Sequence, residues 1–219
     1  MIAGASHPSP NHGDRRGLRP ELIVLHYTGM ADAASARARL CDPDAEVSAH
    51  WLIDEAGHAE ALVPEDRRAW HAGAGTWHGR EDINSRSIGI EIANPGDRPF
   101  TSAQMDALAL LLARIMARWS LGPDAVIGHS DMAPGRKRDP GPRFDWERLA
   151  QQGLAVWPAA PGRDMPLKDS LDLVGYPPVD PETRLEAFRL RFRPWAQGPE
   201  TADDRRVAAS LSKEPADAG

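Results

Sequence analysis

The sequence is poor in cysteine, in long apolar runs and in net positive charge. Cys41 is the only cysteine among the 219 residues, which excludes an internal disulfide framework and a cysteine-based zinc site. No apolar run approaches the roughly 18 residues of a membrane-spanning helix, so a transmembrane protein is excluded. The formal net charge is -6, whereas nucleic-acid-binding proteins usually carry a clustered basic excess. We therefore expect neither a membrane span nor a nucleic-acid partner.

Lysine is also scarce. Only Lys137, Lys168 and Lys213 are lysines among the 26 basic residues, and the rest are arginines. A compositional bias of the genome is the simplest reason, but Lys137 is the sole lysine in the first 160 residues. The hydrophobic share of 41% and the charged share of 26% are those of an ordinary globular protein. The length predicts one main domain with an appendage.

Residues 1–20 are rich in Pro, Gly, His and Arg, and we expect an irregular lead-in there. This segment has no apolar stretch of the secretory type and no lipobox cysteine. We therefore expect a cytoplasmic protein, or a periplasmic one if the sequence is a trimmed form.

Short apolar or alternating segments separated by helical ones predict an α/β domain over 21–157, in which helices flank a mixed central sheet. Strands are expected at 22–25, 47–53, 59–63, 87–93 and 126–128, and helices at 32–40, 105–119 and 145–152. Thr101 and Gln104 form a capping box ahead of the second helix. Residues 70–84 form a long loop without periodicity, and loops of this length are usually functional.

The C-terminal part is expected to be separate and helical. A Pro- and Gly-rich linker at 158–166 leads to a module of three helices at 167–213, and the tail 214–219 is expected to be flexible. About sixty residues bury only a small core, so this all-α module should either lean on the first domain or be only marginally stable alone.

Two histidines follow predicted strands directly, His26 and His129. The carboxyl ends of such strands commonly meet at one edge of a sheet, where sites assemble. A zinc site without cysteine needs histidine and carboxylate ligands, and Asp139 is a candidate third ligand. The spacing alone is a weak signal, and histidines that serve only as hydrogen-bonded structural groups remain the alternative.

Glu91 is unusual for its position in a strand. In the segment 88–92 the isoleucines share one face, while Gly89, Glu91 and Ala93 share the other. A carboxylate between small residues faces something that needs room and charge, although an ordinary solvated strand face is the alternative.

Six blocks in order along the chain carry a family resemblance. They are Leu25-His26-Tyr27-Thr28, Ser48 to Ile53, Trp70-His71-Ala72-Gly73, Asn84 with Ser87 to Glu91, Gly128 to Pro142, and Phe144-Asp145-Trp146. Together they resemble the zinc-dependent N-acetylmuramoyl-L-alanine amidases of type 2, the branch with AmpD-like and AmiD-like enzymes. The resemblance covers residues 22–150, and the C-terminal helices are similar to the peptidoglycan-binding-like module of AmiD-like enzymes. A helical buttress is the alternative for that module.

The resemblance implies that His26, His129 and Asp139 bind Zn²⁺, with Glu91 and Lys137 as the catalytic pair. It implies hydrolysis of the amide between N-acetylmuramic acid, or its 1,6-anhydro form, and L-alanine of the stem peptide. Muropeptides would be the partners, in cell-wall recycling or degradation. The alternative is a non-catalytic muropeptide sensor that uses the same cleft. The residues expected to contact substrate are Tyr27, His50, His71, Asn84 and, as a platform for a sugar ring, Trp77.

Overall fold

The computed structural model describes residues 7–212, and its centre is a five-stranded sheet in the order β4-β3-β6-β2-β7. β3 and β4 are antiparallel, while the other neighbouring strands are parallel. The predicted mixed central sheet flanked by helices is confirmed. The strands are β1 (His12–Gly13), β2 (Leu22–Tyr27), β3 (Trp51–Ile53), β4 (Ala59–Ala61), β5 (Arg68–Ala69), β6 (Ser87–Ile92) and β7 (Val126–Gly128).

Eight α-helices occur within the described residues, and none is long and apolar enough to cross a membrane. Those before residue 157 are α1 (Ala33–Leu40), α2 (Ile83–Arg86), α3 (Ser102–Trp119), α4 (His129–Met132) and α5 (Trp146–Gln151). Those after it are α6 (Leu167–Val174), α7 (Pro181–Phe192) and α8 (Ala202–Leu211). Two short 3₁₀ turns cover Pro43–Ala45 and Pro123–Ala125.

The longest helix, α3, packs on one face of the sheet. The predicted capping box at its start is present, since Thr101 and Gln104 exchange side-chain to backbone hydrogen bonds of 3.1 Å each. Leu108 and Leu112 of α3 then lie in one apolar cluster with Ile88 and other isoleucines of β6. The apolar side of α3 therefore packs against the face of the sheet that carries the isoleucines of β6. The opposite face of the sheet is turned away from α3.

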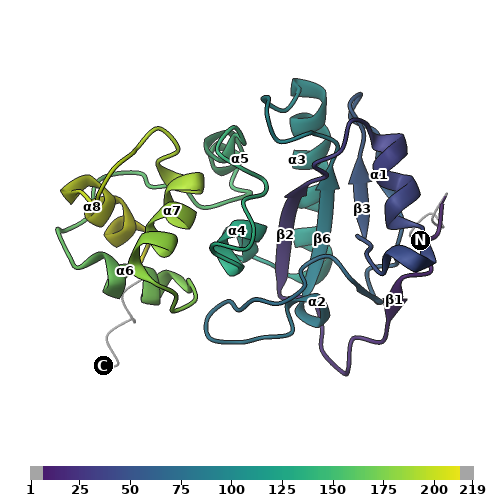
Figure 1. The fold of residues 1–219 in the computed structure, drawn as a ribbon, viewed down its shortest axis with the longest axis horizontal. Coiled ribbons are helices and arrows are strands. Elements are labelled where there is room, and N and C mark those ends of the chain that lie inside the picture. The colour runs from purple at the N-terminus through teal and green to yellow at the C-terminus, as the bar shows by residue number, and fades with distance from the viewer. Residues whose placement is uncertain (1–6, 213–219) are drawn as a thin grey trace.

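The C-terminal helices pack against the face of the sheet opposite α3 and share an apolar core with it. Val24 of β2 and Ile127 of β7 belong to the same apolar cluster as Phe188 and Phe192 of α7. Figure 1 shows α6, α7 and α8 grouped at one end of the molecule, with α4 and α5 between them and the sheet. The predicted linker at 158–166 also contacts these helices, because the Gly162 N–H donates to the Arg206 carbonyl of α8 at 2.9 Å. The three predicted helices are therefore present, and they lean on the first domain.

The lead-in is more ordered than the sequence indicated. β1 pairs with β5, and Arg15 is buried, with its guanidinium donating to the carbonyls of Glu65, Ser85 and Ser87 at 2.9, 2.9 and 3.0 Å. A local reading missed this because all three acceptors lie far along the chain. The expected tail 214–219 and residue 213 of the module lie outside the described residues.

Candidate metal centre and active site

Parallel strands bring the candidate residues to one edge of the sheet. His26 lies at the end of β2, and its register partner on β6 is Glu91. His129 begins α4 directly after β7, whose Gly128 is the register partner of Leu25. Because parallel strands end at the same edge, three segments far apart in sequence meet there.

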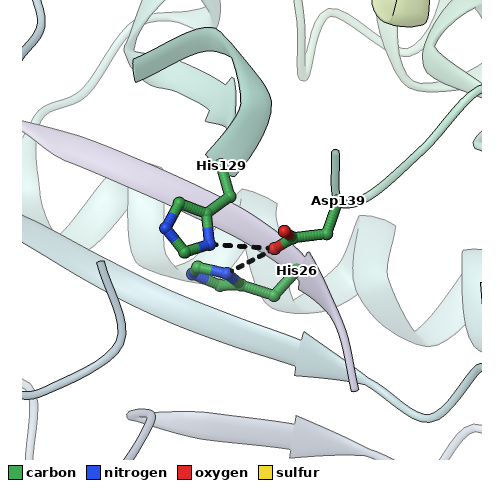
Figure 2. Close-up of side chains that lie close together, drawn as sticks. All are labelled: His26, His129 and Asp139. Carbon is green, nitrogen blue, oxygen red and sulfur yellow. Dashed lines mark hydrogen bonds and ion pairs between the residues drawn. The ribbon is translucent and has the colours of Figure 1, made fainter. Parts of the chain in front are cut away.

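His26, His129 and Asp139 form a compact cluster in which each offers a ligand atom within 4.8 Å of the others. Asp139 Oδ2 lies 2.8 Å from His26 Nδ1 and 3.0 Å from His129 Nδ1. Figure 2 shows both rings turning these nitrogens toward the one carboxylate. All three side chains are buried, so the sequence-based prediction that they come together is met by the geometry.

The hydrogen bonds of Nε2 on His26 and His129, the nitrogens that face away from Asp139, determine which nitrogen of each ring is protonated. His129 Nε2 lies 2.8 Å from the Ala72 carbonyl and 3.3 Å from the Arg136 Nη2 donor, and the shorter contact, to an acceptor, places the ring proton on Nε2. On the other side Ser87 Oγ donates to the Ile83 carbonyl at 2.6 Å and therefore accepts from His71 Nε2 at 3.1 Å. His71 Nδ1 then accepts from His26 Nε2 at 3.0 Å.

These directions leave an unprotonated Nδ1 on both His26 and His129, and both face the Asp139 carboxylate. Three acceptors that converge in this way fit a cation between them. Two nitrogens and one carboxylate oxygen are also a donor set that zinc takes in catalytic sites. Burial, and then the neighbouring His129, lower the pKa of His26 to about 4, which keeps the ring neutral at physiological pH. Burial alone would raise the pKa of Asp139, but the adjacent His129 and His26 rings hold it below its usual range.

His71 lies behind His26 and also lines the cavity in front of the cluster. Burial, followed by His26 and His50, lowers the pKa of His71 well below its ordinary value. A Cβ added to Gly89 would lie 2.3 Å from Cγ of the His71 ring. The room beside Gly89 on β6 is thus occupied by the His71 ring.

Glu91 and Lys137 line the same cavity, which has a volume of about 330 Å³. Oε2 of Glu91 is buried and has no hydrogen-bond partner among the described residues. Burial, and then the charge of Asp139, raise the pKa of Glu91 well above its ordinary value, while Lys137 opposes the rise. The structure therefore brings five of the predicted residues, the three candidate ligands and this pair, to one cavity.

The predicted substrate contacts divide into two groups. Tyr27 and His71 line the cavity, whereas His50, Asn84 and Trp77 do not. His50 is fully buried and accepts from the Gly89 N–H at Nδ1, at 2.9 Å.

Asn84 and Trp77 have structural partners instead of an open face. Asn84 Oδ1 accepts the N–H groups of His71 and Ala72 at 3.0 and 2.8 Å. Trp77 is 3% exposed and packs edge-to-face on Tyr176, so no face is free for a sugar ring.

The sequence reasoning gave no role to Asp131, which lies two residues after the candidate ligand His129. Asp131 is 0% exposed, and its Oδ2 accepts the Gly128 N–H at 2.8 Å. The signal was present, because an acidic residue three positions after a helix N-cap commonly caps that helix. The Pro- and Gly-rich stretch that follows concealed α4.

Comparisons with known proteins agree with this site. The family model described as N-acetylmuramoyl-L-alanine amidase matches residues 16–142. The amidase AmiD of Escherichia coli strain K12 is 35% identical over 230 residues, which covers 88% of this chain and 82% of that protein. The chain belongs to the N-acetylmuramoyl-L-alanine amidase family. The resemblance drawn from the six sequence blocks is confirmed.

Other members of the family agree with the fold. A solved complex of E. coli AmiD with the substrate anhydro-N-acetylmuramic acid-L-Ala-D-gamma-Glu-L-Lys has a TM-score of 0.79 and 34% identity, covering 96% of this chain and 91% of that one. AmpDH3 from Pseudomonas aeruginosa also has a TM-score of 0.79, with 32% identity and coverage of 96% and 97%. The 1,6-anhydro-N-acetylmuramyl-L-alanine amidase AmpD of E. coli K12 is 44% identical over 167 residues, 68% of this chain and 91% of that protein.

Proposed function

We propose that this family member is a zinc-dependent amidase acting on peptidoglycan fragments. It would hydrolyse the amide between N-acetylmuramic acid, or its 1,6-anhydro form, and L-alanine of the stem peptide. The observation that carries the proposal is the convergence of two histidine Nδ1 atoms and one carboxylate beside a cavity that also holds Glu91 and Lys137. The names of the relatives supply the substrate class.

His26, His129 and Asp139 would hold the metal, since their ligand atoms converge and the outer nitrogen of each histidine is hydrogen-bonded. Zinc in such a site acts as a Lewis acid, which makes water more acidic and polarises an amide carbonyl.

Glu91 is the group placed to move the proton. Its unpartnered Oε2 can accept a proton from the attacking water and later donate it to the departing amine nitrogen. In that sequence the water oxygen bonds to the carbonyl carbon, the C–N bond breaks, and the L-alanine amine leaves with the proton. The muramic acid keeps a carboxylate. The raised pKa of Glu91 suits a residue that must hold a proton between these two steps.

Lys137 supplies positive charge to the same cavity. As the amide carbon becomes tetrahedral its oxygen becomes negative, and a fixed ammonium group lowers the energy of that state. Tyr27 and His71 line the cavity, and we propose that they contact the sugar or the peptide of the substrate.

The test combines metal analysis with product identification. Elemental analysis of the purified protein should find about one zinc per chain, and mass spectrometry should find free stem peptide from both muropeptide forms. Chelation should abolish cleavage and added zinc should restore it. Cleavage that survives complete removal of zinc would contradict the mechanism. Muropeptide binding without any turnover would instead favour the sensor.

The form of substrate and the place of action are finer parts of the proposal. We expect a cytoplasmic enzyme that recycles or degrades wall fragments. Fractionation of native cells, with the protein detected by antibody, tests the location. A rate comparison on intact and anhydro muropeptides tests the preferred form.

A further inference from the structure

A buried carboxylate connects the C-terminal helices to the candidate metal centre. Oδ2 of Asp131 accepts a hydrogen bond from the Gly128 N–H, at the residue directly before the ligand His129. The same oxygen accepts from Arg191 Nη1 at 2.7 Å, and Oδ1 accepts from the Tyr176 hydroxyl at 2.6 Å. Arg191 belongs to α7, and Tyr176 lies between α6 and α7.

Arg191 is itself held in one orientation. It is 4% exposed, and its guanidinium carbon lies 4.0 Å from the centre of the Trp146 ring and 4.7 Å from that of Phe192. Contact with two aromatic rings positions a planar guanidinium in a way that lysine would not reproduce. Because Trp146 begins α5 of the first domain, Arg191 contacts both parts of the chain.

Tyr176 is fixed in a similar manner. Its backbone carbonyl accepts from Arg184 Nη2 at 2.8 Å, and its ring packs edge-to-face on Trp77. It is 3% exposed. Neither Tyr176 nor Arg191 lines the cavity that contains the catalytic pair, so neither is placed to contact substrate there.

We infer that the C-terminal helical module positions the metal centre: Arg191 and Tyr176, through Asp131, hold α4 so that Nδ1 of His129 faces Asp139. This inference rests on the metal site of the proposed function. α4 has only four residues and cannot fix its own orientation by length. The buried Asp131 carboxylate supplies the constraint, since it holds the backbone before His129 and is held by two side chains of the module.

Zinc affinity is the measurement that separates this role from a purely structural one. Partners that orient metal ligands typically change metal affinity by about 10–100-fold when they are removed. We expect Tyr176→Phe and Arg191→Leu to weaken zinc binding by about that factor in competition with a chromophoric chelator. Turnover under subsaturating zinc should fall, while KM for a muropeptide at saturating zinc changes little. In the cobalt-substituted protein both variants should alter the visible absorption spectrum.

Arg189 provides a matched control on the same helix. It is 7% exposed and pairs with Asp204 of α8 at 2.6 Å, inside the module and away from α4. Arg189→Leu should lower the melting temperature but change zinc affinity less than about threefold. If Arg191→Leu does not fold, Tyr176→Phe still decides, because it removes only a hydroxyl group.

Each outcome has a distinct meaning. Unchanged zinc affinity in Tyr176→Phe, or an equal loss of affinity in Arg189→Leu and Arg191→Leu, would overturn the positioning role whatever the turnover. Zinc binding that depends on Tyr176 in a chain without amidase activity would support the positioning role and refute the proposed function. An unmodified chain that binds no zinc would refute both.

Discussion

The buried ring of His50 should make the folded protein less stable in acid. The ring is fully buried, and because Nδ1 accepts from the Gly89 N–H, Nε2 carries the proton and donates to the Arg67 carbonyl at 3.0 Å, with Arg15 Nη2 2.8 Å from the same nitrogen. Burial, and then the charge of Arg15, lower the pKa of His50 from its ordinary value of about 6.5 to about 3. Between these two values the unfolded chain binds a proton at this position and the folded chain does not.

The size of the effect follows from that interval. Stability falls as the pH falls wherever the unfolded state binds more protons, so the loss begins near pH 6.5 and is complete below about pH 3. Between pH 7 and pH 5 a group with these two pKa values contributes a loss of about 2 kcal/mol, at about 1.4 kcal/mol for each unit. His50→Gln offers an acceptor and a donor without a titrating ring, so it should lack this part of the acid loss.

Urea unfolding of the metal-free unmodified chain and of His50→Gln, each at pH 5, 7 and 8, measures the difference. The unfolding free energy of the unmodified chain should fall by about 2 kcal/mol more than that of the variant between pH 7 and 5. Between pH 7 and 8 the two curves should run parallel, which serves as the internal control. Equal losses in both proteins between pH 7 and 5 would refute the reasoning.

Two further predictions concern the catalytic pair. Glu91→Gln should lower kcat by about 10²–10⁴-fold, because the amide cannot accept the proton of water, and elemental analysis should find its zinc content unchanged. Full turnover in that variant would remove Glu91 from the mechanism. Lys137→Arg should lower kcat by about tenfold or more, since a planar guanidinium cannot replace a compact ammonium group beside the reacting carbonyl. Steady-state kinetics that match the unmodified enzyme would show that positive charge alone suffices.

The sequence was most informative where a local pattern determines the structure. The alternation in 87–92 predicts that Glu91 lies on the face of β6 opposite the isoleucines, and Thr101 with Gln104 predicts the start of α3. The apolar run that ends at His26 gave a buried strand of the predicted sheet. In each case the signal lies within a few residues, which is the range over which periodicity and capping operate.

Long-range partners could not be read in the same way. His50 and His71 are both histidines next to small residues, yet one is enclosed by the Arg67 carbonyl and Gly89 while the other reaches the cavity. Trp77 was predicted to contact a sugar ring, but Tyr176, far along the chain, packs against the Trp77 ring. Tertiary contacts of this kind have no counterpart in local sequence pattern.

Asn84 positions the two groups that accept hydrogen bonds from Nε2 of the candidate ligands His26 and His129. Its Oδ1 accepts from the N–H groups of His71 and Ala72, while the His71 ring accepts from His26 and the Ala72 carbonyl accepts from His129. One amide oxygen therefore fixes two adjacent residues that set the proton positions on both ligands.

Asn84→Ala should weaken zinc binding by about 10–100-fold, the effect expected when the hydrogen-bonded support of metal ligands is lost. Asn84→Asp retains the accepting oxygen and should keep most of the affinity, which makes it the matched control. Chelator competition on both variants distinguishes the two. If Asn84→Ala binds zinc as tightly as the unmodified chain, the segment at 71–72 is held without Asn84. In that case the proton positions on His26 and His129 do not depend on that amide oxygen.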